Sequence, residues 1–300
     1  MQTNYYALND LLIQKLQSNE PFSLLRIDNT AGFVLDCINR GVVPDRQHYN
    51  EYTLVEGGVP GNMEYAFNKL WPDTLDAMRQ CDILGFVDVS GDIRRSNLIK
   101  QFEDKPTFFH KDTAILDPGG VLGYYSEYKK LETPWTQYLK GKKVLAISSH
   151  VDSIKFQWEH LDRIWGKDKD KIVPFELVDC IRTPYHPSVD DRQIPGCNTF
   201  DSIVDHMKNV IDTYDYDVLL TSVTTQSPFY AEHAKQRGKV GIQTGGTLQL
   251  FFGVLGGRWL HSPSFKEWVP MFNEWWIHPF DEDKPQRVIH PNLETNYAYW

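Results

Sequence analysis

The sequence contains only four cysteines in 300 residues, and none of them form a C-x-x-C pair. Structural zinc sites and disulfide-stapled secreted domains use closely spaced cysteines, so the sequence favours neither class. The chain also lacks a run of about 18 apolar residues, which a membrane-spanning helix requires. Its first residues include neither a basic segment nor a long apolar one, so we expect no signal peptide and a cytoplasmic location.

Positive charge is scarce as well, because 31 Lys and Arg stand against 40 Asp and Glu and give a net charge of −9. A broad basic surface is the electrostatic signature of nucleic-acid binding, so we expect no nucleic-acid partner. Three common motifs are missing: the G-x-G-x-x-G dinucleotide fingerprint, the P-loop and the G-x-S-x-G nucleophile elbow. NAD binding, ATP binding and Ser-His-Asp hydrolysis therefore have no motif to support them.

Short apolar runs alternate with helical segments along most of the chain. The expected strands cover residues 22–27, 83–87, 106–110, 143–148, 171–178, 217–222 and 239–243. The expected helices cover residues 7–18, 31–40, 62–70, 73–80, 134–141, 153–165, 200–214, 227–238 and 247–255. This alternation predicts an α/β fold with a Rossmann-like, doubly wound and mostly parallel sheet. We expect one domain over residues 1–300, with residues 260–300 as an extended tail that wraps it.

The most distinctive stretch is residues 239–259, where we expect a strand, a glycine turn and a buried helix that ends at a second glycine pair. Its candidate ligand-binding residues are Thr244, Gly245, Gly246, Gln249 and Arg258. Glycines let a phosphate approach the backbone, and free N–H groups at the start of a helix attract an anion. A lone glycine pair also occurs in ordinary tight turns, and Arg258 is equally suited to capping the preceding helix.

Two other turns follow expected strands, at the end of a parallel sheet where ligands bind. Their candidate residues are Arg26, Asp28 and Asn29 in one turn, and Ser149, His150 and Lys155 in the other. Arg26 lies in an apolar strand and needs an anionic partner if it is buried, which Asp28 or a ligand phosphate would supply. Lys155 opposes the helix dipole unless an anion is near, which makes it a candidate phosphate ligand.

Asp28 and His150 are the candidates for acid–base catalysis. Both have structural alternatives, since Asp28 is suited to capping a helix and His150 to bonding a loop carbonyl. Asp152 is expected to cap the helix that follows it. Three D-x-D triplets begin at Asp168, Asp215 and Asp281. We reject them as metal sites, because the second lies at the amino end of an expected strand and the others lie in charged, solvent-like stretches.

Three segments together resemble a family of bacterial and viral glycan-locus proteins with the GT-D type glycosyltransferase fold. The segments are GIQTGGTLQLFFGVLGGRW (241–259), FSLLRIDNTAGFVL (22–35) and VLAISSHVDSIKFQW (144–158). The first is the most specific, with its glycine pair, L-Q, F-G and G-x-R-W. The resemblance extends over nearly the whole chain.

This resemblance implies transfer of a sugar from a nucleotide-diphosphate donor, of the UDP type, to a glycan or glycoprotein acceptor. It also implies a donor at the carboxyl edge of the sheet. Enzymes of the GT-D type carry a D-x-E motif in the first turn that engages a divalent metal, Mn²⁺ or Mg²⁺. Asn29 and Ala31 occupy the corresponding positions here, so the Glu is missing and metal dependence stays open.

The sequence therefore predicts a glycosyltransferase in which Gly245 and Gly246, helped by Arg26 or Arg258, hold the donor diphosphate. Asp28 or His150 would activate the acceptor hydroxyl. Two alternatives stay open: a methyltransferase that uses S-adenosylmethionine, and a nucleotide-sugar-binding homologue without catalysis.

Overall fold

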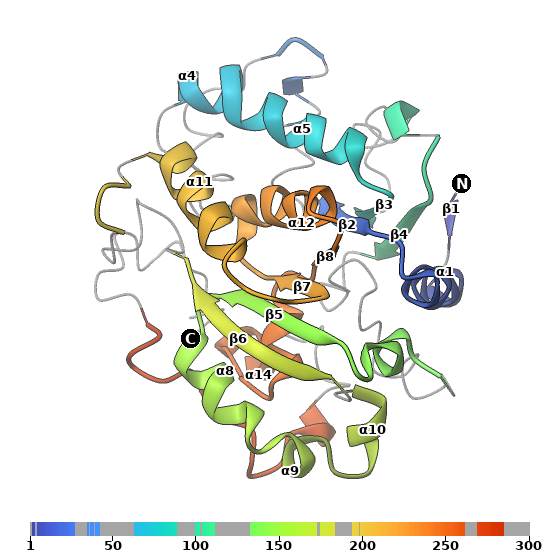
Figure 1. Cartoon of the computed structure of the whole chain (residues 1–300), viewed down its shortest axis with the longest axis vertical. Coiled ribbons are helices and arrows are strands. Elements are labelled where there is room, and N and C mark those ends of the chain that lie inside the picture. Colours follow the sequence, from blue (N-terminus) through green and yellow to red (C-terminus); the bar gives the residue numbers. More distant parts are fainter. Residues whose placement is uncertain are drawn as a thin grey trace.

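The computed structural model describes residues 2–3, 5–27, 35, 37–38, 40–42, 63–88, 100–102, 104–111, 133–172, 175–183, 194–197, 199–261 and 269–284. They contain an eight-stranded sheet in the order β1-β4-β3-β2-β8-β7-β5-β6, in which the strands pair in parallel (Figure 1). The strands are β1 (Gln2–Thr3), β2 (Phe22–Ile27), β3 (Ile83–Asp88), β4 (Thr107–Lys111), β5 (Lys143–Ser148), β6 (Glu176–Arg182), β7 (Val218–Thr221) and β8 (Val240–Gln243). This confirms the predicted α/β class with a parallel sheet.

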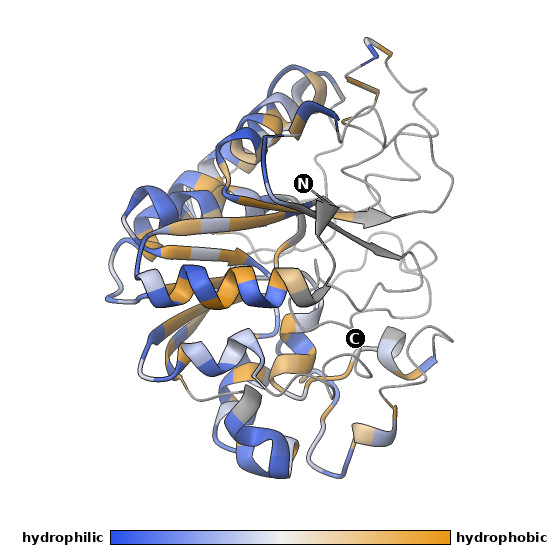
Figure 2. Ribbon diagram, turned by 90° about the vertical axis from the view of Figure 1, so that its right-hand side faces the viewer, coloured by the Kyte–Doolittle hydropathy of each residue, from blue (hydrophilic) through white to orange (hydrophobic). Residues whose placement is uncertain are grey.

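The central strands are buried on both faces, which explains why they are continuous apolar runs in the sequence. In β5, Val144 and Ala146 point into one core cluster, while Leu145 and Ile147 point into another. Alternate side chains of a strand point to opposite faces, so each strand contributes to both clusters. Figure 2 shows the result, with largely hydrophobic strands and helices that carry hydrophilic and hydrophobic stripes.

Helices cover the two faces of the sheet. The first set contains α4 (Met63–Tyr65), a π-helix (Ala66–Leu70), α5 (Trp71–Gln80), α11 (Phe200–Ile211) and α12 (Ser227–Gln236). The second set contains α1 (Tyr5–Ser18), a 3-10 helix (Trp135–Leu139), α8 (Val151–Trp158), α9 (Leu161–Trp165), α13 (Thr247–Phe251) and α14 (Gly257–His261). We call the side covered by the first set the α12 face and the other side the α13 face. Shorter helices are α10 (Lys169–Ile172) and the 3-10 turns Lys100–Phe102, Gly166–Asp168, Thr224–Gln226 and Val269–Met271.

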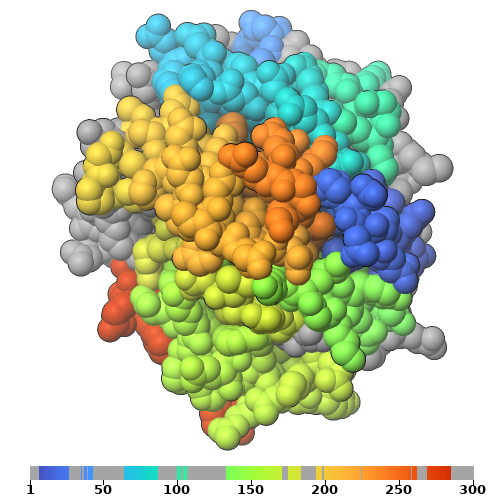
Figure 3. Space-filling view, in the orientation of Figure 1, coloured from blue at the N-terminus to red at the C-terminus, as the bar shows by residue number. Residues whose placement is uncertain are grey.

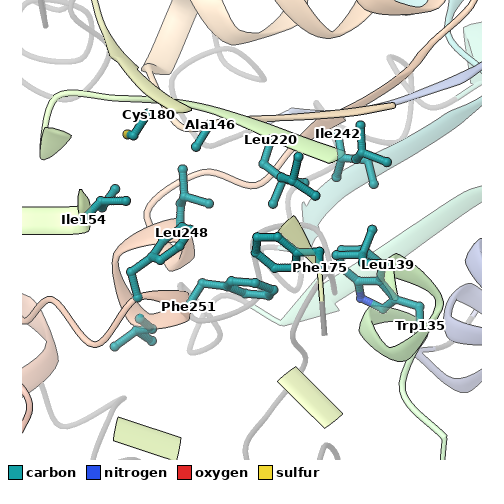
Figure 4. Close-up of a cluster of buried hydrophobic side chains, with 14 of the residues drawn as sticks. Trp135, Leu139, Ala146, Ile154, Phe175, Cys180, Leu220, Ile242, Leu248 and Phe251 are labelled. Carbon is teal, nitrogen blue, oxygen red and sulfur yellow. The ribbon is translucent and has the colours of Figure 1, made fainter. Parts of the chain in front are cut away.

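The core of the α13 face forms where α13 packs under the sheet (Figure 4). Leu248 and Phe251 of α13 belong to this core, and the ring of Phe251 stacks on that of Phe175 at a centroid distance of 5.9 Å. Trp165 at the end of α9 donates its indole N–H to the Phe251 carbonyl at 2.9 Å. This bond satisfies one of the orphan carbonyls at the C-terminal end of α13.

On the α12 face, the α12 backbone approaches β8 so closely that a side chain is excluded at Gly241. A Cβ at this position would collide with the backbone carbonyl of Ala231. On β2, the strand next to β8, the Ser23 hydroxyl donates to the buried Glu232 carboxylate of α12 at 2.7 Å. In the space-filling view of Figure 3, α11 and α12 lie side by side over the middle of the molecule.

Two expected elements differ from the structure around α8. The helix expected over residues 153–165 is divided into α8 and α9. His160 donates from Nδ1 to the Phe156 carbonyl at 2.9 Å, and its amide bonds to Gln157 O. In a regular helix the His160 amide would donate to the Phe156 carbonyl. Because the His160 ring occupies that carbonyl, the first helix ends here. The strand expected over 171–178 is also misplaced, because β6 begins at Glu176, opposite Lys143 of β5. Pro174 cannot donate a ladder hydrogen bond, in keeping with the later start.

The helix expected over 247–255 is shorter, because α13 ends at Phe251. Gly253 has φ +68°, and Val254 donates to Gln249 O, as at a glycine-terminated helix end. Gly257 then begins α14 instead of ending a helix. The segment expected to be a helix over 134–141 is a 3-10 helix, and most of the helix expected over 31–40 lies outside the described residues.

Candidate functional site

The carboxyl ends of β2 and β8 lie side by side near the middle of the sheet, since the two strands pair with Leu24 opposite Ile242. The next described helices after β2 lie on the α12 face, whereas α13 follows β8 on the other face. In open parallel sheets, ligands bind where neighbouring strands lead to opposite faces. The β2–β8 edge is therefore the position in this fold where a ligand site is expected.

The glycine turn after β8 is fixed by hydrogen bonds to β7 and the residue after it. Thr244 donates both its amide and its hydroxyl to Thr221 O, and the Ser222 hydroxyl donates to Gly245 O at 2.6 Å. Gly245 has φ +60°, a conformation that glycine adopts without strain. Within the described part of the chain, the amides of Gly245 and Gly246 donate to no protein acceptor. The turn thus presents two backbone donors.

Arg26, near the end of β2, reaches the same turn. Its amide donates to the buried Gln243 side chain at 3.0 Å, which ties the ends of β2 and β8 together. Its guanidinium lies against Gly245, where an added Cβ would collide with Nη1. Among the described residues, the buried Nε atom has no hydrogen-bond partner and no carboxylate forms an ion pair with the side chain.

Among the described residues, the half-buried guanidinium has no acidic partner and the two neighbouring amide donors have no acceptor, an arrangement that an oxyanion would complete. Burying a charge is unfavourable unless it is paired, and Arg presents several donors in a fixed fork. The structure therefore brings together three of the predicted ligand-binding residues, Arg26, Gly245 and Gly246. Thr244, a fourth, anchors the turn through bonds of its own.

His150 and Gln249, two further predicted residues, are in direct contact. Gln249 Nε2 lies 2.9 Å from His150 Nε2, and the Trp259 indole nitrogen lies 3.3 Å from Gln249 Oε1. All three side chains are buried. An indole N–H only donates, so the Gln249 oxygen faces Trp259 and its amide nitrogen faces His150. His150 Nε2 therefore accepts this bond, and the ring hydrogen belongs on Nδ1.

The beginning of α8 is already occupied by a carboxylate from far along the chain. Asp283 is fully buried and accepts hydrogen bonds from the amides of Asp152 and Ser153, at 3.0 and 2.8 Å. Arg182 Nη2 lies 2.7 Å from Asp283 and 2.7 Å from Asp152, and Nη1 donates to Ser149 O. Asp152 is therefore not the cap of this helix, and the prediction that it caps α8 is wrong.

The pKa of Asp283 reflects this environment. Burial by itself raises the pKa of a carboxyl group, but hydrogen bonds from Ser153 and Asp152 and contact with Arg182 hold the Asp283 pKa below its usual range. The group is thus ionised and serves as the anion at this helix terminus. A ligand phosphate bound near Ser149 would have to share or replace that position.

Lys155 does not point an unpaired charge toward a ligand. Its ammonium lies 2.7 Å from the Asp179 carboxylate on β6. Burial of Asp179 raises its pKa, but this contact and the Tyr214 hydroxyl outweigh burial and lower it. The ion pair gives Lys155 a partner within the protein, so a phosphate would have to compete with Asp179.

Several predicted residues fall where the structure gives no side-chain geometry. Asp28 and Asn29 lie outside the described residues, and Arg258 is placed in α14 without a described side chain. Among the side chains that the structure does describe, no cluster of three or more His, Cys, Asp and Glu is arranged to hold a metal ion.

Two of the rejected D-x-D triplets, which begin at Asp215 and Asp281, have described contacts. Asp215 and Asp217 lie at the amino end of β7, as expected, where they contact Lys143. Asp281 is exposed and pairs with Lys284, which also fits the expectation. Asp283 does not, because it is buried, so the expectation that its stretch is solvent-like is wrong at this residue.

Sequence reasoning missed Gln243, Trp259, Arg182 and Asp283. A polar residue at the carboxyl end of an apolar strand is a signal that could have identified Gln243 and Arg182. Asp283 had no such signal, because its partners lie 101 to 131 residues earlier in the chain.

The fold and this geometry define a parallel α/β protein with a candidate oxyanion site at the β2–β8 edge. No protein-family model matches the chain, and no match is found among curated proteins or among solved structures. None of the helices within the described residues has the length and apolar character needed to cross a membrane.

Proposed function

We propose that the protein is a glycosyltransferase that moves a sugar from a nucleotide-diphosphate donor, of the UDP type, to the hydroxyl of a glycan acceptor. One observation carries the proposal: the Arg26 guanidinium, which has no acidic partner among the described residues, lies against the Gly245 turn at the β2–β8 edge. A diphosphate supplies the negative charge that this arrangement lacks. The resemblance of residues 241–259 to GT-D type transferases supports the same donor class.

In this proposal, Arg26 and the amides of Gly245 and Gly246 hold the diphosphate. They stabilise it as a leaving group, because donors already in place favour the charge that develops when the sugar bond breaks. Arg258 follows the turn in sequence and is proposed as a second cation for the diphosphate. A divalent cation, Mn²⁺ or Mg²⁺, would supplement these groups, with Asn29, which follows β2 in sequence, as a candidate ligand.

The acceptor hydroxyl needs a base, and the structure distinguishes between the two candidates, Asp28 and His150. His150 Nε2 already accepts a hydrogen bond from Gln249, so its free lone pair is engaged. This contact favours Asp28 as the base. His150 then orients the side chain of Gln249, and the backbone amide of Gln249 donates to Gly246 O at the glycine turn.

The first test is thermal unfolding with UDP, GDP, CDP, dTDP, S-adenosylmethionine or NAD, each with and without Mn²⁺ or Mg²⁺. A ligand at a hundred times its dissociation constant adds about 2.7 kcal/mol to the free energy of unfolding. Stabilisation by one nucleoside diphosphate is the expected result. Stabilisation by S-adenosylmethionine alone would overturn the proposal in favour of a methyltransferase.

Binding must then be separated from catalysis. The matching nucleotide sugar is incubated with the protein and a panel of glycan acceptors, and release of the nucleoside diphosphate is measured. Acceptor-dependent release supports a transferase. Tight donor binding without release under any acceptor would instead identify a nucleotide-sugar-binding protein.

Arg258 has its own test. Arg258→Ala is expected to weaken donor binding, measured as the loss of nucleotide-induced stabilisation. A folded Arg258→Ala variant with unchanged binding would remove this residue from the site.

A further inference from the structure

The start of α8 is a complete oxyanion site with its own occupant. Four donor groups surround the Asp283 carboxylate: the amides of Asp152 and Ser153, the Ser153 hydroxyl and the Arg182 guanidinium. The carboxylate is fully buried, whereas the Arg182 side chain keeps 25% of its surface exposed. Backbone donors at a helix start combined with an arginine form a typical recognition geometry for carboxylate or phosphate.

Several contacts hold residues 269–284 against α8 and α9, and that of Asp283 lies nearest to the end of this segment. Phe280 donates its amide to the Ser153 hydroxyl, and Gln157 donates to the carbonyl of Trp275. Ile277 forms a parallel bridge with Val254, just after α13. Figures 1 and 3 show this C-terminal segment, in red, beside the green α8–α10 region. We call residues 269–284 the strap.

The contacts of the strap are not equivalent. The hydrogen bonds of Phe280, Trp275 and Ile277 use backbone groups of the strap, and the rings of Phe280 and Trp275 also pack on Phe156 and His160. Asp283 is the described strap residue whose charge is matched by a cation and by a helix start. Asp281, two positions earlier, is 91% exposed and contacts only Lys284 by ion pairing within the described residues.

We propose that Asp283 is an internal ligand of a carboxylate-specific oxyanion site, and that its binding there latches the strap over α8. The site would take a small free carboxylate in place of Asp283 when that side chain is removed. The latch also fixes the turn before α8, because Arg182 bonds to Ser149 O while it holds Asp283. Strap attachment and the position of His150, the next residue, are therefore coupled.

The test is chemical rescue of Asp283→Ala. This substitution deletes the carboxylate and leaves a space with the shape of formate. Hydrogen exchange is measured at the amides of residues 275–280 in the wild type and in the variant. We expect exchange in the variant to be at least about tenfold faster, which corresponds to about 1.4 kcal/mol of lost local stability.

Added sodium formate should restore slow exchange in Asp283→Ala with a saturable dependence on concentration, as ligand linkage requires. Sodium chloride at equal ionic strength controls for screening and should restore nothing. Asp281→Ala is the matched control, and it should exchange like the wild type with or without formate. Inorganic phosphate in place of formate tests selectivity, and equal rescue by phosphate would overturn the carboxylate specificity.

Unchanged exchange in Asp283→Ala would show that the carboxylate does not latch the strap. Rescue by chloride equal to that by formate would show that no oxyanion site exists. If Asp283→Ala fails to fold, Asp283→Asn keeps the size of the side chain and is measured in the same way. Faster strap exchange in Asp283→Asn supports the latch, and wild-type exchange contradicts it.

Discussion

Gly245→Ala tests the link between the glycine turn and Arg26 without touching the arginine. Gly245 has φ +60°, and an added Cβ there would meet the Arg26 guanidinium. Gly238 provides a matched control, because it has φ +75° and nothing lies within 4 Å of its added Cβ. An alanine in the left-handed region costs about 1–2 kcal/mol, so each variant should lose that much stability.

The two variants should differ in ligand binding and not in stability. The atom displaced by Gly245→Ala is the end of a flexible side chain, so moving it adds little to the backbone strain. Its displacement removes charge-assisted hydrogen bonds to the ligand, each with a contribution of about 1.5–3 kcal/mol. We therefore expect the affinity for the stabilising nucleoside diphosphate to fall roughly ten- to hundredfold in Gly245→Ala.

The assay is thermal unfolding of both variants over a titration of that nucleotide. Gly238→Ala should keep the affinity of the wild type despite its lower midpoint. Equal affinities in the two glycine variants would refute the reasoning, because they would show that the position of the Arg26 guanidinium beside the turn has no effect on binding.

Three further predictions concern neighbouring groups. Lys155→Met should leave nucleotide-induced stabilisation unchanged, because Lys155 pairs with Asp179; a loss of stabilisation comparable to that of Gly245→Ala would show that Lys155 does bind phosphate. Trp259→Phe removes the donor to Gln249 and should lower the free energy of unfolding by about 1–3 kcal/mol, measured by denaturant titration; wild-type stability would contradict the assigned network. Burial raises the pKa of the Cys81 thiol to about 12, so it should resist a thiol reagent at neutral pH until the protein unfolds, and rapid labelling of the native protein would argue against its burial.

Much of the fold follows from local sequence patterns. The β5 strand was predicted with its observed bounds, because Lys143–Ser148 is a clear apolar run bounded by a glycine and a polar turn. The β6 strand was misplaced, because Asp179 and Arg182 interrupt its apolar pattern. Their charges are tolerated at the edge of the sheet, where each finds a partner in α8 or the strap.

The candidate site was predictable where it depends on strand ends alone. Arg26 and Gly245 belong to turns after parallel strands, and the carboxyl ends of parallel strands meet at one edge. The polar network around Gln249 was only half predictable: a buried glutamine needs partners, but the sequence does not say which. The anion at the start of α8 is Asp283, which no local pattern connects to that helix.

The measurement that tests the central claim most directly is a calorimetric titration of UDP, with and without Mn²⁺, into the wild type and into Arg26→Gln. The account predicts saturable binding to the wild type and an affinity lower by roughly tenfold or more in the variant, since a charged partner of the phosphate is lost. The variant should keep its fold, because Arg26 forms no ion pair among the described residues. Equal affinity in the two proteins, or no binding of UDP to the wild type, would contradict the account.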